Sequence, residues 1–197
     1  SQALPGGGRA YETRFFGHIE GELGGNYQEK NANTILTATM HLYNKGVIKN
    51  TESIEKGFAN VCEMTGLMGR WQTILKQPLV ICDTGHNAGG WKYLSQQIKH
   101  TPCKQRRIVF GMVDDKDLHS VMGMLPDDAV YYWTQPSTHR AFPVHKVSET
   151  ADAYNLQGKQ YPTVMEAYRA ALADADKDDF IFVGGSSYVV ADLLAGI

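Results

Sequence analysis

The 197-residue sequence has few cysteines, no long apolar run and almost no net charge. Its three cysteines, Cys62, Cys82 and Cys103, are odd in number and lack a CxxC spacing, which argues against a disulfide framework and against a zinc cage. A formal net charge of -2 provides no electrostatic attraction for nucleic acid or anionic lipid, and every apolar run is too short to cross a membrane. We therefore expect a cytoplasmic protein without nucleic-acid or membrane partners.

Two nucleotide-binding motifs are missing as well. No GxGxxG sequence follows a predicted strand, which argues against a dinucleotide-binding domain. The segment Gly184-Gly185-Ser186-Ser187 does not match the GxxxxGK[ST] pattern of a phosphate-binding loop. The sequence therefore contains neither of these two loops for binding nucleotide phosphates.

The sequence does have 43% hydrophobic residues, which is enough for a sizeable core. Its first part is irregular: Pro5 to Gly8 predicts a flexible opening, and broken alternation over residues 11–23 predicts short strands or a strand and a turn. Apolar side chains at helical spacing predict an amphipathic helix over residues 31–45. A second helix is predicted from Thr51 or Ser53 to the break at Thr65-Gly66.

Beyond Gly69, strands alternate with helices, which is typical of a mostly parallel sheet covered on both faces. We therefore predict an α/β fold with a Rossmann-like sheet of about six strands, and a domain boundary near residues 66–70. The predicted strands are residues 71–75, 79–82, 107–111, 130–134, 160–161 and 180–183. The predicted helices are residues 88–99, 118–124, 143–155, 164–174 and 188–194.

The most informative segment is the turn Asp83-Thr84-Gly85-His86-Asn87, which directly follows the apolar strand predicted over residues 79–82. The carboxyl ends of the strands in an open α/β sheet border the ligand crevice, so these polar side chains are expected there. Asp83 and His86 have the chemistry to bind ribose hydroxyls, hold a metal or transfer a proton. A purely structural interpretation is that Asp83 caps the next helix.

Three further turns are expected at the same edge, over residues 111–117, 134–140 and 184–187. Ser186 and Ser187 could offer hydroxyl and backbone N–H donors to a carboxylate or phosphate, or simply cap a helix. Arg70 could bind phosphate oxygens or stack on Trp71. The acidic run at residues 114–117 is interpreted as a solvated helix start, so no metal site is predicted.

Several segments together resemble one known family. The segments Gly69-Arg70-Trp71-Gln72 and Ile81-Cys82-Asp83-Thr84-Gly85-His86-Asn87 resemble the Gly-Arg-(aromatic) and Asp-x-(Ala/Gly)-His-Asn motifs of folylpolyglutamate synthase and dihydrofolate synthase, in the Mur ligase superfamily. Residues 25–32 are similar to the Gly-x-(His/Tyr)-Gln-x-x-Asn-Ala segment that closes the central ATPase domain of those enzymes. Residues 110–117, 134–141 and 185–188 follow in the family's order, so the resemblance covers residues 23–194.

The resemblance implies a monomeric, ATP- and Mg2+-dependent ligase with small-molecule substrates. ATP would phosphorylate a carboxylate of a folate or dihydropteroate, and the amino group of L-glutamate would attack the acyl phosphate to give an amide. By family likeness, ATP would contact Asn31 through adenine, Arg70 through its phosphates and Asp83 through ribose. The remaining implied site residues are His86 and Ser186, as catalytic groups beside glutamate, and Asn87 and Ser187, as substrate-binding groups.

The sequence also departs from the family. Ala88 replaces the proline that usually follows His-Asn, which removes rigidity from the turn but no polar side chain. The family's phosphate loop, metal ligands and much of its pterin pocket precede the segment seen here. Residues 1–66 therefore resemble the C-terminal remnant of the central ATP-binding domain, and residues 67–197 resemble the C-terminal glutamate ligase domain. We expect this chain alone to be inactive, with Mg2+ bound mainly upstream of it.

Two other classes of protein stay open at this point. One is another Mur-type peptide ligase of cell-wall synthesis, although His86 in the Asp-x-Gly-His-Asn motif favours the folate branch by family likeness. The other is a non-catalytic Rossmann-like binding module, in which residues 1–66 would have no evident use.

Overall fold

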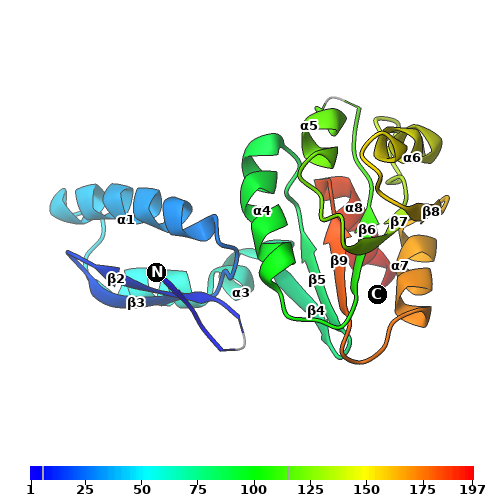
Figure 1. Ribbon diagram of the computed structural model, residues 1–197. Coiled ribbons are helices and arrows are strands. Elements are labelled where there is room, and N and C mark those ends of the chain that lie inside the picture. Colours follow the sequence, from blue (N-terminus) through cyan, green and yellow to red (C-terminus); the bar gives the residue numbers. More distant parts are fainter. Residues whose placement is uncertain (6, 115) are drawn as a thin grey trace. The chain divides into compact units, whose positions relative to one another are not determined.

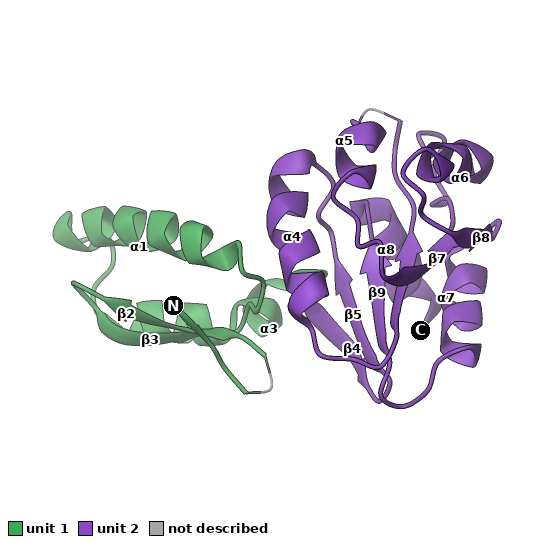
Figure 2. Cartoon of the chain, viewed as in Figure 1, with its two compact units in different colours: residues 1–71 green, residues 72–197 purple. Residues whose placement is uncertain are grey.

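The computed structural model describes residues 1–5, 7–114 and 116–197 and divides into two compact units, Ser1–Trp71 and Gln72–Ile197 (Figure 2). The division after Trp71 lies just beyond the boundary predicted near residues 66–70. Gly6, in the predicted flexible opening, and Asp115, in the predicted acidic helix start, lie outside the described residues. In the part of the chain that is described, no helix has the length and apolar character needed to cross a membrane.

Unit 1, Ser1–Trp71, is a small antiparallel sheet with three helices (Figure 1). The sheet order is β1-β2-β3, which confirms short strands where the alternation was broken. The predicted second helix is in fact two helices, because Asn60 leaves the helical conformation with φ -132° and ψ 30°. The strands are β1 (Gln2–Ala3), β2 (Arg9–Thr13) and β3 (Gly17–Gly21), and the helices are α1 (Gln28–Asn44), α2 (Glu52–Ala59) and α3 (Val61–Thr65).

Unit 2, Gln72–Ile197, contains a 6-stranded sheet of order β4-β5-β9-β6-β7-β8. Among the described strands of this sheet, only β4 runs antiparallel to its neighbour, so the predicted mostly parallel α/β fold is confirmed. The strands are β4 (Gln72–Lys76), β5 (Leu79–Asp83), β6 (Arg106–Phe110), β7 (Ala129–Trp133), β8 (Gly158–Gln160) and β9 (Phe180–Gly184). The helices are α4 (Ala88–His100), α5 (Leu118–Met122), α6 (Val144–Asp152), α7 (Val164–Ala173) and α8 (Ser187–Gly196).

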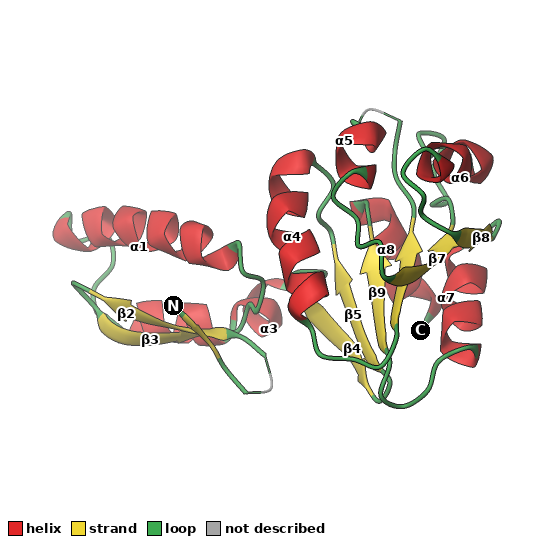
Figure 3. Cartoon of the chain, in the orientation of Figure 1, coloured by secondary structure: helices red, strands yellow, loops and turns green. Residues whose placement is uncertain are grey.

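Helices cover both faces of this sheet, and the side-chain alternation of the strands explains why (Figure 3). On one face, the buried Trp91 of α4 makes edge-to-face ring contacts with Phe110 of β6 and Phe182 of β9. On the other face, the alternate strand residues form a cluster with α7 and α8. This cluster includes Val80, Cys82, Val109, Ile181, Val183, Ala167, Ala171, Val189, Val190 and Leu193. Each central strand therefore has apolar side chains that face both layers of helices.

The end of α4 is held by a buried arginine. Arg106, at the start of β6, donates from Nε to the carbonyl oxygen of Ile98 at 3.0 Å and from its guanidinium to that of Lys99 at 2.9 Å. These carbonyls belong to the last turn of the helix, where backbone acceptors lack helical partners. Asp128 forms an ion pair with the same guanidinium, which neutralises it. The Arg106 side chain therefore fixes the C-terminal end of α4 against the start of β6.

We expect Arg106→Lys to lower the free energy of unfolding by about 2 kcal/mol, because a single ammonium cannot donate to all of these acceptors. Urea denaturation measures the change. The matched control is Arg169→Lys on the exposed surface of α7, which should change stability by less than about 0.5 kcal/mol. Equal effects of the two substitutions would contradict this role for Arg106.

His18 on β3 lies between two glutamates on the exposed side of the hairpin. Its Nδ1 lies 2.6 Å from Glu12 Oε1, directly across the strand pair, and its Nε2 lies 3.5 Å from Glu20 Oε1. Hydrogen bonding to Glu12, and then to Glu20, raises the pKa of His18 above its ordinary value. A raised pKa means that the protonated ring favours the folded hairpin at low pH, and that this contribution is lost as pH rises through the folded-state pKa.

We therefore predict that an NMR titration gives His18 a pKa above 6.5. Glu12→Gln should lower that pKa more than Glu20→Gln does, because the Glu12 contact is the shorter one. Glu149→Gln, an exposed change on α6, is the control and should leave it unchanged. An identical His18 pKa in all the variants would show that the glutamates do not act on the ring.

Candidate functional site

The sheet of unit 2 has a topological switch point at β5 and β9. These strands are parallel neighbours, with Asp83 of β5 in register with Gly184 of β9. The helix that follows β5, α4, packs on the face bearing Phe110 and Phe182, whereas the helix that follows β9, α8, packs on the opposite face. Connections that leave neighbouring strands toward opposite faces open a crevice at the carboxyl ends of those strands. The two turns at this crevice are residues 83–87 and 184–187.

Contacts between its own residues fix the conformation of the first turn. Asp83 is fully buried, and its Oδ1 accepts a hydrogen bond from the backbone N–H of Gly85 at 2.8 Å. The half-buried ring of His86 contacts the carbonyl oxygen of Thr84 through Nδ1 at 3.0 Å. Asn87, not Asp83, is the N-cap of α4, accepting from Gly90 N at 2.9 Å. The interpretation of Asp83 as the helix cap is therefore wrong, because its carboxylate stabilises the turn before the helix begins.

The second turn depends on a glycine in a left-handed conformation. Gly185 has φ +104°, and a Cβ on it would lie 2.4 Å from the carbonyl oxygen of Gly111, so no other residue fits there without strain. Ser186 follows, 1% exposed, and its Oγ accepts from the N–H groups of Tyr188 and Val189. The capping interpretation of Ser186 is confirmed. Ser187 is exposed in the first turn of α8.

The turn after β7, residues 134–140, is fixed by contacts that the sequence analysis missed. Asp192 of α8 accepts from both the backbone N–H of Ser137 at 2.7 Å and its hydroxyl at 2.6 Å. A bridge between Val113 and Ala141 joins the same loop to the turn after β6. Asp192 lies 55 residues from Ser137, so no local pattern could have revealed the pair.

Three buried polar atoms among the described residues have no hydrogen-bond partner: Thr84 Oγ1, Trp91 Nε1 and Thr134 Oγ1. Thr84 directly follows β5, and Thr134 directly follows β7, so two of these atoms lie at the carboxyl edge of the sheet. Buried hydroxyls are normally hydrogen-bonded, so each of these atoms is a polar group that a water or a ligand could satisfy. Neither threonine is among the site residues predicted from the sequence.

The neighbouring thiol offers no nucleophile. Cys82 lies in β5 beside Asp83 and is fully buried. Burial, and then the Asp83 carboxylate, raise the pKa of Cys82 to about 12, which keeps the thiol protonated near neutral pH. The reactive groups of the two turns are therefore oxygen and imidazole side chains.

The acidic run at residues 114–117 leads into α5. Asp117, the N-cap of α5, accepts from Ser120 N at 3.0 Å, which confirms a helix start in the acidic run.

Two predicted site residues lie in unit 1 and are described there alone. Asn31 is exposed on α1 and donates from Nδ2 to Gln28 Oε1 at 3.0 Å. Arg70 is half-buried between Gly69, with φ 69°, and Trp71, with φ 51°. A positive φ at a tryptophan is a genuine backbone outlier, and such strain is concentrated at functional sites.

A family model described as "Mur ligase, glutamate ligase domain" matches residues 69–187. This chain belongs to the Mur ligase family. The matched segment begins at the Gly69-Arg70 turn and ends at the start of α8, so it contains both turns of the crevice.

Curated and solved relatives agree with this membership. The chain is 30% identical over 167 residues to dihydrofolate synthase/folylpolyglutamate synthase of Escherichia coli K12, covering 84% of this chain and 37% of that protein. It resembles the solved E. coli FolC in complex with DHPP and ADP, with 26% identity and TM-score 0.75 over 98% of this chain and 44% of that one. A bifunctional folylpolyglutamate synthase/dihydrofolate synthase with Mn, AMPPNP and L-glutamate bound is 29% identical, with TM-score 0.63, over 75% of this chain and 35% of that one. The resemblance to the folate branch of the Mur ligases is therefore confirmed. The chain spans 37% of the length of its E. coli relative.

We expect Ser186→Ala to lower the free energy of unfolding by about 1 kcal/mol, because two N–H groups at the start of α8 lose their acceptor. Thermal or urea unfolding measures the loss. Ser187→Ala is the matched control, since this exposed residue lies inside the helix, where alanine is favourable. The cap assignment fails if Ser187→Ala destabilises the protein as much as Ser186→Ala.

Proposed function

We propose that this chain is the C-terminal part of an ATP-dependent ligase that adds L-glutamate to a folate or dihydropteroate carboxylate through an acyl phosphate. The supporting observation is the switch point itself, where Asp83 and Gly184 are in register and His86 and Ser186 follow them in the two turns. The family model identifies a glutamate ligase domain and does not name the acceptor of the glutamate. The names of the relatives favour a folate as the acceptor.

Within this proposal, the N-terminus of α8 receives a carboxylate of glutamate. Ser186 uses its oxygen to accept two N–H groups, which leaves its O–H to donate. The partial positive charge of the helix start favours an anion there, and Ser187 supplies a second hydroxyl in the same turn. Asn87 uses Oδ1 as the cap of α4, so its Nδ2 is the group that contacts substrate.

The proposed ATP contacts are adenine with Asn31, the phosphates with Arg70 and ribose with Asp83. An arginine fork suits phosphate oxygens, and the strained Gly69-Arg70-Trp71 turn fixes the backbone that carries it. The unpartnered Thr84 hydroxyl beside Asp83 is a further polar group that fits a ligand at this edge. ATP would supply the phosphoryl group that activates the carboxylate. A related ligase structure holds Mn and AMPPNP, and we propose that ATP phosphates and Mg2+ contact mainly residues outside this chain.

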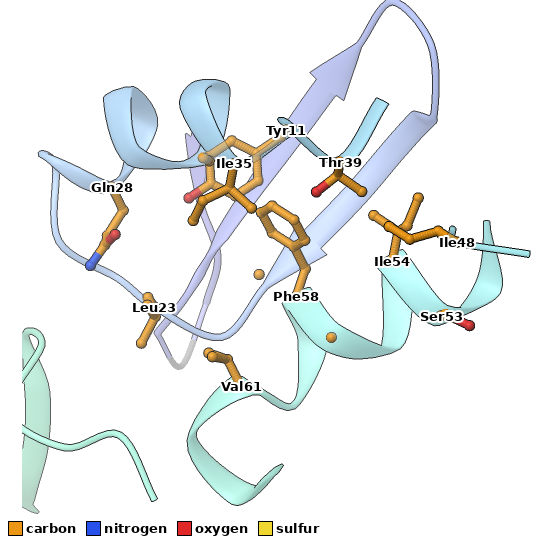
Figure 4. Close-up of a pocket in the computed structure, with 13 residues that line it drawn as sticks. Tyr11, Leu23, Gln28, Ile35, Thr39, Ile48, Ser53, Ile54, Phe58 and Val61 are labelled. Atoms are coloured by element: carbon orange, nitrogen blue, oxygen red, sulfur yellow. The ribbon is translucent and has the colours of Figure 1, made fainter. Parts of the chain in front are cut away.

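We also propose that unit 1 belongs to a larger ATP-binding domain. An apolar cavity of about 340 Å³ lies between the hairpin, α1 and α2 (Figure 4). Tyr11, Ile35 and Phe58 line it, and Ile35 on α1 is 51% exposed. Apolar side chains left exposed around a cavity favour coverage by further polypeptide. The relatives are long enough to provide it, since this chain spans 37% of the E. coli protein.

The test is a chimera in which this chain replaces the matched segment of the E. coli relative. We expect ATP-dependent joining of L-glutamate to dihydropteroate or a reduced folate, followed by mass spectrometry of the product. Arg70→Ala should lower kcat/KM by about 100-fold, because a phosphate-binding cation is lost. The control is Arg169→Ala on the exposed face of α7, which should retain the activity of the chimera. A folded chimera that makes no glutamyl amide, or that is unaffected by Arg70→Ala, would contradict the proposal.

A further inference from the structure

Trp71, the last residue of unit 1, has a backbone conformation that a tryptophan does not favour. Its φ is 51°, in the left-handed region that residues other than glycine, asparagine and aspartate rarely adopt. Such a conformation costs free energy and persists only where surrounding contacts hold it. The side chain of Trp71 is half-buried, so packing of its indole ring is the contact expected to hold this backbone.

The indole ring of Trp71 lies against Gly24, in the segment that leads into α1. A Cβ on Gly24 would lie 3.4 Å from Cδ1 of Trp71 and 3.2 Å from the backbone nitrogen of Gly8. The φ of Gly24 is outside the left-handed region, so its backbone would accept other residues. The position therefore depends on the absence of a side chain, which lets the ring pack closely on the backbone.

Hydrogen bonds fix the chain on either side of Gly24. Before it, the backbone N–H of Glu22 donates to the carbonyl oxygen of Phe58 in α2 at 3.0 Å. After it, the backbone N–H of Gln28 donates to the carbonyl oxygen of Gly25 at 2.9 Å, where α1 begins. The indole ring therefore packs on a segment whose position is set by two helices of unit 1.

This contact joins the segments that carry two residues of the proposed ATP site. Arg70 directly precedes Trp71, and Asn31 lies in the first part of α1, where its Nδ2 donates to Gln28 Oε1 at 3.0 Å. Arg70 and Asn31 are distant in sequence but belong to the same compact unit. The packing of Trp71 on Gly24 therefore sets where the arginine lies relative to the start of α1.

We propose that Trp71 is a positioning residue, whose indole ring packs on Gly24 and so holds Arg70 at a fixed place relative to Asn31 for binding one nucleotide. This inference rests on the proposed function, which supplies ATP and its contacts with Asn31 and Arg70. A long arginine side chain loses rotamer freedom when it binds phosphate, and a fixed backbone limits the further freedom that must be lost. Packing of the ring offsets the strain of the left-handed φ at Trp71.

Substitutions at Trp71 separate the ring from the backbone. Asparagine tolerates a left-handed φ but has no ring, whereas phenylalanine keeps a ring on the same strained backbone. In the chimera with the E. coli relative, we expect Trp71→Asn to raise KM for ATP about tenfold, because the phosphate-binding group is displaced, and Trp71→Phe to raise it less. KM for L-glutamate should not change in either variant. An unaltered KM for ATP in Trp71→Asn would overturn the inference.

A double-mutant cycle shows whether Trp71 acts through Arg70. In the Arg70→Ala background, Trp71→Asn should cause no further loss of kcat/KM for ATP, because the group that the ring positions is already absent. Additive losses would give Trp71 a general structural role and overturn the inference, while the proposed function would stand. If Arg70→Ala alone causes no loss, the proposed ATP contact is contradicted, and the inference fails with it.

Gly24 tests the same contact from the other partner. In NMR spectra of this 197-residue chain, a cross-peak between the ring Hδ1 of Trp71 and the Hα protons of Gly24 is expected. Its absence would overturn the inference without affecting the proposed function. Gly24→Val should shift the indole N–H signal of Trp71 and raise KM for ATP in the chimera. Gly57→Val on α2 is the matched control and should change neither measurement, because a Cβ there meets no atom within 4 Å.

Discussion

The candidate site depends on one constraint of sheet topology: the helices that follow β5 and β9 cover opposite faces of the sheet. Trp91 packs α4 on one face of the sheet through Phe110 and Phe182, while Val189 and Val190 pack α8 into the hydrophobic cluster on the other face. Two neighbouring strand ends are thereby left open, and their turns carry the polar side chains. The apolar packing of the two helices therefore places both polar turns at the same edge of the sheet.

The polar side chains of the two turns can stabilise the fold and still offer groups to a ligand. Asn87 and Ser186 both use an oxygen lone pair to cap a helix, and each retains donors on the same side chain. Asp83 stabilises its own turn, and the Thr84 carbonyl of the same turn contacts His86. Capping fixes the position of each group, and a fixed position is what the proposed binding requires.

The two units differ in how completely their apolar surface is buried. Unit 2 covers both faces of its sheet with helices, whereas unit 1 has an apolar cavity beside α1, with Ile35 and Leu42 of that helix exposed. This contrast is one reason for the proposal that unit 1 belongs to a larger domain.

The sequence by itself determined the elements of unit 2 and their order, because apolar strands between polar turns and helices form a strong local pattern. It also located the turns at Asp83 and Ser186, since glycines and capping residues act within a few positions of the chain. Tertiary structure alone decided that Asn87 rather than Asp83 caps α4, that Asn60 divides the second predicted helix, and that Asp192 holds Ser137. Those outcomes depend on backbone geometry and on partners far apart in sequence. The insertion of β9 between β5 and β6 is of the same kind, because strand order follows from packing on both faces of the sheet rather than from any local pattern.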